Sequence, residues 1–182
     1  MQDDAASALA LLRRPSWLTS VLALALALTF IALGRFGWTP RFWCLVPLLF
    51  ALAVIIVLDL RTKIIPDVLT LPGIAFALAV AAFTNNPSPG EAVLGAVAGG
   101  GIVFLLAVVS RGAVGGGDIK LMAMLGAALG WKGALAVFAL SQVAAALVAV
   151  VLLIARRAGR WELLPVGAFI AFFGAIVLLG AP

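Results

Sequence analysis

The sequence predicts an all-α protein: a polytopic bundle of six or seven transmembrane helices in one integral membrane domain, residues 1–182. Apolar residues make up 65% of the chain and charged residues 10%, against about 45–50% and about 25% in soluble domains. This apolar content also excludes intrinsic disorder. Because one crossing takes about 20 apolar residues, the chain can form six or seven crossings and has no room for a separate soluble domain.

Seven apolar runs define the expected helices. In chain order they are Trp17–Leu33, Phe42–Leu58, Val68–Phe83, Ala92–Val109, Ile119–Trp131, Gly133–Ala155 and Leu163–Gly180. The first run follows two arginines, as the apolar part of a signal peptide does. It is longer than that part usually is, and no Ala-x-Ala site follows it, so we expect a retained helix. The fifth run is too short to cross a bilayer alone.

The basic residues predict the orientation, because cytoplasmic loops are enriched in Lys and Arg. If all seven runs cross, nine basic residues fall on the side of the N-terminus: Arg13, Arg14, Arg61, Lys63, Arg111, Lys120, Arg156, Arg157 and Arg160. Only three fall on the other side: Arg35, Arg41 and Lys132. We therefore expect a cytoplasmic N-terminus, and we expect Asp59, Asp67 and Asp118 to lie together at the cytoplasmic face.

The residues that are absent narrow the chemistry. The chain has no His and one cysteine, Cys44. These facts exclude Ser-His-Asp triads, Cys-His pairs, His-ligated zinc and an intrachain disulfide. We expect no metal and no cofactor. We also expect no nucleic-acid partner, because the basic residues are dispersed along the chain. Acid–base groups must then come mainly from the seven acidic residues: Asp3, Asp4, Asp59, Asp67, Glu91, Asp118 and Glu162.

Asp59 follows a long run of apolar residues. A carboxylate at the bilayer centre costs roughly 3 kcal/mol, and less near an interface. Asp59 is therefore either a functional group or an interfacial acid paired with Arg61 or Lys63. Taken alone, the residue does not distinguish the two interpretations.

Asp118 follows three consecutive glycines, Gly115, Gly116 and Gly117, and opens the fifth apolar run. Glycines lack side-chain bulk, so another chain can approach them closely. The glycines and nearby Lys120 are thus candidates for an active-site loop along which a substrate approaches. The alternative is a flexible loop in which Asp118 caps a helix.

Together, Asp59 and Asp118 predict a catalytic pair at one membrane face. Two close carboxyl groups do not both ionise easily, so they share a proton. One then activates water while the other donates to the substrate, which is the chemistry of aspartic proteases. For Asp67 we favour a structural role, because Pro66 suits a helix start and an acid in the first turn complements the helix dipole.

Two segments with these aspartates resemble the type IV prepilin peptidases, a family of GxGD intramembrane aspartyl proteases. The first motif is DxRxxxIPDxLTLPG, from Asp59 to Gly73, and the second is GGGDIKL, from Gly115 to Leu121. LPVGAF, from Leu164 to Phe169, resembles the final-helix motif of the family more loosely. The family usually has Asn where this chain has Asp67, and both residues can cap a helix.

The resemblance implies an endopeptidase of the bacterial inner membrane. Its members remove a short basic leader from prepilins or pseudopilins at the cytoplasmic face, with Asp59 and Asp118 as the catalytic pair. Larger members carry a cytoplasmic domain with paired cysteines and also N-methylate the pilin. The short segment Gly34–Arg41 and the single Cys44 resemble the minimal type that serves Flp/Tad pili, so methylation is not expected.

Two other functions remain open from the residues. A proton-coupled transporter could use Asp59 and Asp118 as relay groups, since acids inside membranes often carry protons. Such transporters often contain inverted repeats, and none is visible here. A non-catalytic scaffold for pilus assembly would be favoured by degraded motifs, but both aspartates are present.

Overall fold

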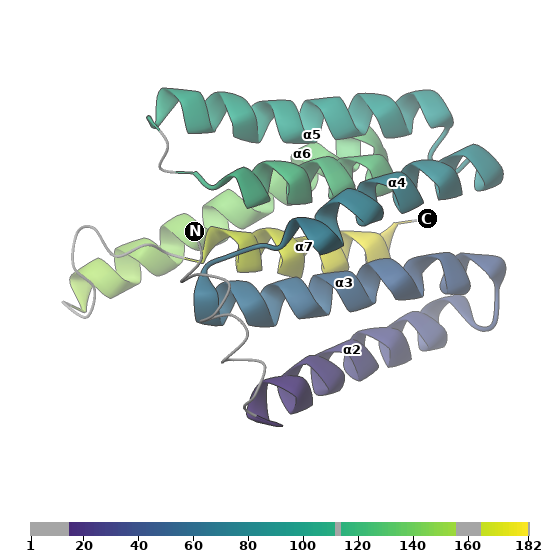
Figure 1. Ribbon diagram of the computed structural model, residues 1–182, viewed down its shortest axis with the longest axis horizontal. Helices are drawn as coiled ribbons and strands as arrows, with labels where there is room; N and C mark the ends of the chain where they lie inside the picture. Colours follow the sequence, from purple (N-terminus) through teal and green to yellow (C-terminus); the bar gives the residue numbers. More distant parts are fainter. Residues whose placement is uncertain (1–14, 112–113, 156–164, 182) are drawn as a thin grey trace.

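The structure, a computed structural model, describes residues 15–111, 114–155 and 165–181. Within these residues it contains six helices and no strand: α2 (Pro15–Phe36), α3 (Pro40–Thr62), α4 (Asp67–Thr84), α5 (Pro89–Val109), α6 (Gly116–Ile154) and α7 (Val166–Gly180) (Figure 1). Five of them, α2 to α6, are long and apolar enough to cross a membrane, and α7 is a shorter apolar helix. The predicted all-α, multi-pass architecture is confirmed.

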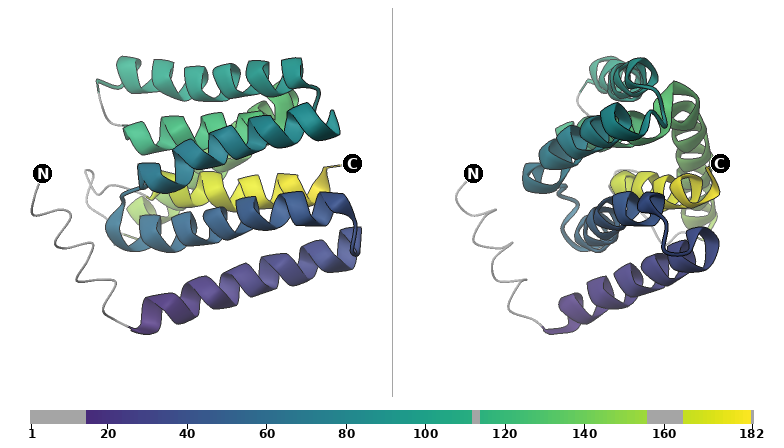
Figure 2. Two further views of the ribbon diagram at one scale, coloured as in Figure 1. Left: turned by 45° about the vertical axis from the view of Figure 1, so that its right-hand side comes forward. Right: turned by 90° about the vertical axis from the view of Figure 1, so that its right-hand side faces the viewer.

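Successive helices run in alternating directions, with α7 near the middle of the bundle (Figures 1 and 2). The last helix packs against α3 on one side and α6 on another, while α5 lies along α6 and α2 along α3. Both α3 and α5 end at the end of the bundle where α4, α6 and α7 begin (Figure 2). The aspartates predicted to lie together are all at this end, which we call the aspartate end.

The long helix α6 contains a break at Gly130. A straight helix of its 39 residues would measure about 58 Å, roughly twice the hydrocarbon thickness. Gly130 has φ 71° and ψ 177°, a conformation that favours glycine, and the chain turns back there so that the second half of α6 returns toward the aspartate end (Figure 1). The two predicted helices Ile119–Trp131 and Gly133–Ala155 are thus joined, with the reversal at Gly130.

Small residues bring α5 and α6 into close contact, as their spacing predicts. A Cβ atom added to Gly95 would overlap the carbonyl oxygen of Gly126 and would lie 2.8 Å from the Cα atom of Gly130. At Gly99 the added atom would lie 2.6 Å from the carbonyl oxygen of Met122. These contacts hold the first half of α6, which carries Asp118, against α5.

The described helices start one to three residues from their predicted positions, and two of these starts show how the chain begins a helix. The predicted run Ala92–Val109 begins earlier, at Pro89, because Ser88 and Glu91 form a capping box. At α4, Asp67 is the first helical residue and Pro66 is the N-cap, without a side-chain cap hydrogen bond. Asp67 therefore lies in the first turn, as expected, but neither residue caps the helix through its side chain.

The described basic residues are divided as the sequence predicts. Arg61, Lys63, Arg111 and Lys120 lie at the aspartate end, and Arg35, Arg41 and Lys132 lie at the other end. The other five basic residues lie outside the described residues. They account for most of the predicted excess of basic residues on the side of the N-terminus. That the aspartate end faces the cytoplasm stays a prediction.

Candidate active site

Asp59 lies in the last turn of α3 and is buried, with 4% of its surface exposed. The backbone N–H of Ala168, in the first turn of α7, donates a hydrogen bond of 2.6 Å to Oδ2 of Asp59. Among the described residues, Asp59 makes no ion pair with Arg61 or Lys63. The ion pair that the alternative interpretation expects is therefore not formed by these residues.

Asp118 is the third residue of α6 and is half-buried. Gly115, and not Asp118, is the N-cap residue of this helix. The glycines differ in their surroundings. A Cβ atom on Gly117 would lie 2.8 Å from Cβ of Ile65, whereas Gly116 has no neighbour within 4 Å. Gly117 is thus covered by Ile65 of the same chain, and Gly116 is open; the approach of a substrate chain to these glycines stays a prediction.

The two aspartates meet at Gly167, in the first turn of α7. A Cβ atom added there would lie 3.0 Å from Cγ of Asp59 and 2.9 Å from Oδ1 of Asp118. The two carboxyl groups are therefore within about 6 Å of each other, a range in which charges perturb one another's ionisation. Three helices build this site, since α3 supplies Asp59, α6 supplies Asp118 and α7 separates them with a residue that has no side chain.

Ile65 closes the site from the loop between α3 and α4. It is buried, with 9% of its surface exposed, and its side chain packs against both Gly117 and Gly167. At Gly167 the added Cβ atom would lie 2.5 Å from Cδ1 of Ile65. One apolar side chain thus contacts the turn of α6 that carries Asp118 and the turn of α7 that lies between the two carboxyl groups.

Lys120 and Asp67 form an ion pair at the edge of the site. The ammonium of Lys120 lies 2.6 Å from Oδ2 of Asp67, with 38% and 55% of the two side chains exposed. The contact joins α4 to α6 near their first turns. Asp67 thus has a structural contact, whereas the proposed contribution of Lys120 to substrate approach stays a prediction.

Sequence reasoning gave no role to Ile65, Gly167 or Ala168. Ile65 belongs to the first motif, and the other two belong to the loosely matching one. A tertiary hydrogen bond from a backbone N–H requires only that the residue is not proline, so alanine at position 168 gives no positive signal of it. The motif around Gly167 was the one available signal.

The chemistry of the site is that of two carboxyl groups at close range. Within the described parts of the chain, no three His, Cys, Asp or Glu side chains come together as metal ligands would. Partial burial excludes bulk water from around Asp59, while Asp118 retains exposed surface through which water or a substrate can reach the pair. Such an arrangement suits proton transfer between a substrate and two acids.

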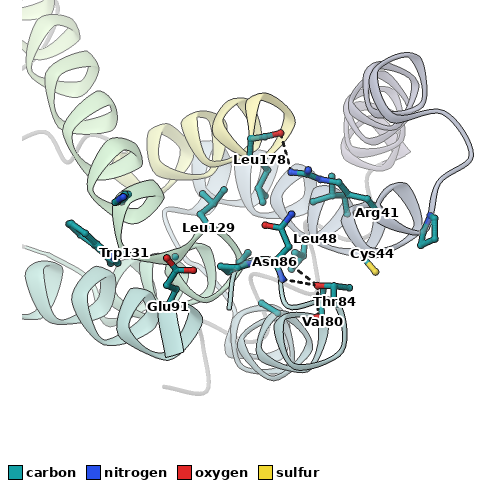
Figure 3. Close-up of a pocket in the computed structure, with 18 residues that line it drawn as sticks. Arg41, Cys44, Leu48, Val80, Thr84, Asn86, Glu91, Leu129, Trp131 and Leu178 are labelled. Carbon is teal, nitrogen blue, oxygen red and sulfur yellow. Dashed lines mark hydrogen bonds between the residues drawn. The ribbon is translucent and has the colours of Figure 1, made fainter. Parts of the chain in front are cut away.

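A separate cavity of about 450 Å³ lies at the other end of the bundle (Figure 3). It is lined from α3, α4, α5, α6 and α7, with Arg41 and Glu91 on opposite sides and Asn86 between them (Figure 3). Glu91 accepts hydrogen bonds from Ser88, and Arg41 donates to the carbonyl oxygen of Ala181. None of the predicted site residues lines this cavity.

Comparisons with known proteins agree with the motifs. The model of the type IV leader peptidase family matches residues 46–150. Over 168 residues, 89% of this chain and 56% of the relative, the chain is 33% identical to a prepilin leader peptidase/N-methyltransferase of Aeromonas hydrophila. A protein of the same name from Burkholderia pseudomallei strain K96243 is 37% identical over 159 residues, 83% of this chain and 51% of the relative.

The chain spans about half the length of the curated relatives it matches. No solved structure matches it significantly. The names of these relatives agree with a peptidase and give no support to the transporter that was the alternative interpretation.

Proposed function

Because the chain belongs to the type IV leader peptidase family, we propose that it is an aspartic endopeptidase that removes the leader peptide from prepilins or pseudopilins. Asp59 and Asp118 are its catalytic pair in this proposal. The observation that carries the proposal is their convergence on Gly167 from two different helices.

The proposed reaction begins with the pair sharing one proton. The ionised carboxylate accepts a proton from a water molecule as the water oxygen attacks the scissile carbonyl carbon. The protonated carboxyl donates its proton to the carbonyl oxygen, which gives a tetrahedral diol. When the diol collapses, the C–N bond breaks and the leaving nitrogen receives a proton from the pair. Each step uses only the two carboxyl groups and water.

The proposed setting is the bacterial inner membrane, with the aspartate end at the cytoplasmic face. The substrate is a prepilin whose basic leader lies in the cytoplasm and whose apolar helix lies in the bilayer. Gly115 and Gly116 are exposed beside Asp118, which supports a path for the extended leader across the start of α6. Lys120 lies one turn further along α6, paired with Asp67.

The test is cleavage of a co-expressed prepilin by the full chain, followed by N-terminal sequencing of the product. Asp59→Asn and Asp118→Asn each remove one acid at nearly constant volume, so we expect each to reduce leader removal by at least about 1,000-fold, as loss of essential catalytic groups does. Asp67→Asn is the matched control, because it makes the same change at the same end.

The outcome depends on comparing variants that are equally abundant in the membrane. If Asp59→Asn or Asp118→Asn processes the prepilin at close to the normal rate, the assignment of the pair is wrong. If Asp67→Asn alone abolishes cleavage, Asp67 belongs to the catalytic set. Should all variants and the wild type leave every prepilin intact, the peptidase proposal itself is refuted.

A further inference from the structure

The first turn of α7 has an unusual arrangement of hydrogen-bond partners. Every helix begins with backbone N–H groups that have no partner within the helix. At α7 the N-cap residue is Pro165, and it makes no side-chain cap hydrogen bond. The N–H of Ala168 lies 3.2 Å from the carbonyl oxygen of Pro165 but only 2.6 Å from Oδ2 of Asp59. The role of a capping side chain is thus taken by Asp59, from another helix.

This contact fixes the direction of the Asp59 carboxyl group. A backbone N–H can only donate, so Oδ2 is held as an acceptor and turned toward α7. Oδ1 remains for the reaction. The group has little freedom to rotate away, because Asp59 is 4% exposed and Ala168 is 6% exposed.

Gly167 determines how close the second carboxyl group can come. Its missing side chain leaves a space bounded by Asp59, Asp118 and Ile65, each within 3.0 Å of where a Cβ atom would be. Real Cβ atoms essentially never lie closer than this distance, so alanine at this position would move at least one of the three. Gly167 lies in a regular helix, so this close packing, and not backbone conformation, requires glycine.

We propose that the first turn of α7 positions the catalytic pair: the N–H of Ala168 orients Asp59, and the absent side chain of Gly167 lets Asp118 lie beside it. The inference rests on the proposed peptidase function of Asp59 and Asp118. Gly167 and Ala168 are positioning residues in it, since they act through the two aspartates and the reaction needs no atom of theirs.

The first experiment removes only the N–H of Ala168. Replacing Ala168 with lactic acid by nonsense suppression in cell-free synthesis converts the amide to an ester and leaves the side chain unchanged. The matched control is the same replacement of Ala175, a buried residue in the middle of α7. We expect the ester at 168 to lower kcat for a purified prepilin at least tenfold with KM within twofold, and the ester at 175 to leave kcat within twofold.

Thermal unfolding separates positioning from folding. Both esters remove one helix-associated N–H, so similar Tm values with different kcat values support positioning. Equal kcat values for the two esters would overturn the role of Ala168. If Asp59→Asn is inactive while the ester at 168 cleaves normally, only this inference fails. If Asp59→Asn itself cleaves normally, the proposed function fails.

The second experiment fills the space at Gly167. Gly167→Ala adds one methyl group between the carboxyl groups, and we expect kcat to fall at least 100-fold. Gly101→Ala is the matched control, because Gly101 lies within α5 with no neighbour within 4 Å of the added atom. We also expect the carboxyl bands assigned to Asp59 and Asp118 in infrared difference spectra to shift in Gly167→Ala and not in Gly101→Ala. Unchanged bands together with normal cleavage by Gly167→Ala would overturn the inference.

Discussion

The two ends of the bundle use their charged groups differently. At the end with the cavity, charges stabilise helix termini: Glu91 completes the capping box of α5, while Arg35 and Arg41 donate to the last carbonyl oxygens near the end of α7. At the aspartate end, two carboxyl groups lie side by side, and Asp59 accepts a hydrogen bond from a backbone N–H of α7. The first arrangement satisfies polar groups, whereas the second brings like charges together.

The difference shows that the cavity and the candidate active site are separate features of this protein. A cavity lies beside Arg41, yet Arg41 and Glu91 in its lining already form hydrogen bonds at helix ends. Placing two acids together at the other end has a cost that a purely structural contact does not require. We therefore locate the chemistry by the arrangement of charges and not by the size of the hollow.

The largest expected contrast between the ends is their accessibility from opposite sides of the membrane. Lys63 and Lys132 are both exposed, one at each end. In a Cys44→Ala background, we expect a membrane-impermeant maleimide added to intact cells to label Lys132→Cys but not Lys63→Cys. Permeabilised cells should show both. Labelling of position 63 alone in intact cells would reverse the predicted topology.

The next largest effect is expected at Ile65, whose side chain packs against both Gly117 and Gly167 at the aspartate end. Ile65→Ala removes a buried side chain and should destabilise the protein by about 2–5 kcal/mol. Cleavage should fall as well, because the first turns of α6 and α7, which place Asp118 beside Asp59, lose their common contact. Ile64→Ala is the control, since Ile64 is 47% exposed. Equal Tm values for the two variants would show that Ile65 does not hold the site together.

At the other end, loss of a cap should affect stability without affecting the reaction. Ser88→Ala removes the side chain that accepts from the N–H of Glu91 and should cost about 1 kcal/mol of unfolding free energy. The kcat for a prepilin should stay within twofold. A Tm decrease with normal kcat would support the distinction between the ends, while a loss of kcat at unchanged Tm would contradict it.

The smallest effect is expected for Asp67→Asn. Exposed ion pairs contribute about 0.2–1 kcal/mol, so losing the contact with Lys120 should lower Tm only slightly. Lys120→Ala should lower Tm by a similar amount, and the double variant by no more than either single change. Additive losses would mean that the two side chains stabilise the protein independently.

The sequence predicts the fold and the candidate pair because both depend on strong local signals. Apolar runs of membrane-spanning length define the helices, and each aspartate interrupts an otherwise apolar environment. The reversal is predicted at Lys132, between the runs Ile119–Trp131 and Gly133–Ala155, and the structure places it two residues earlier, at Gly130. The capping box could have been recognised from Ser88 and Glu91, three residues apart.

The surroundings of the pair could not be predicted in the same way. The contact between Ala168 and Asp59 joins residues 109 positions apart through a backbone N–H. Alanine carries no chemical signal, and only the packing of α7 against α3 determines which N–H reaches the carboxyl group. Local patterns therefore identify the acids, while tertiary packing determines how each is held.

The contacts between α3 and α7 have one more consequence. Arg41, near the start of α3, donates to Ala181 just after α7, and Asp59, near the end of α3, accepts from Ala168 at its beginning. Hydrogen bonds thus join the two antiparallel helices at both ends. Adding one residue within α7 would rotate one hydrogen-bonding residue relative to the other by about 100° and translate it by about 1.5 Å. The length of α7 is thereby matched to that of its neighbour, so a one-residue insertion within this helix should disrupt at least one of the two contacts.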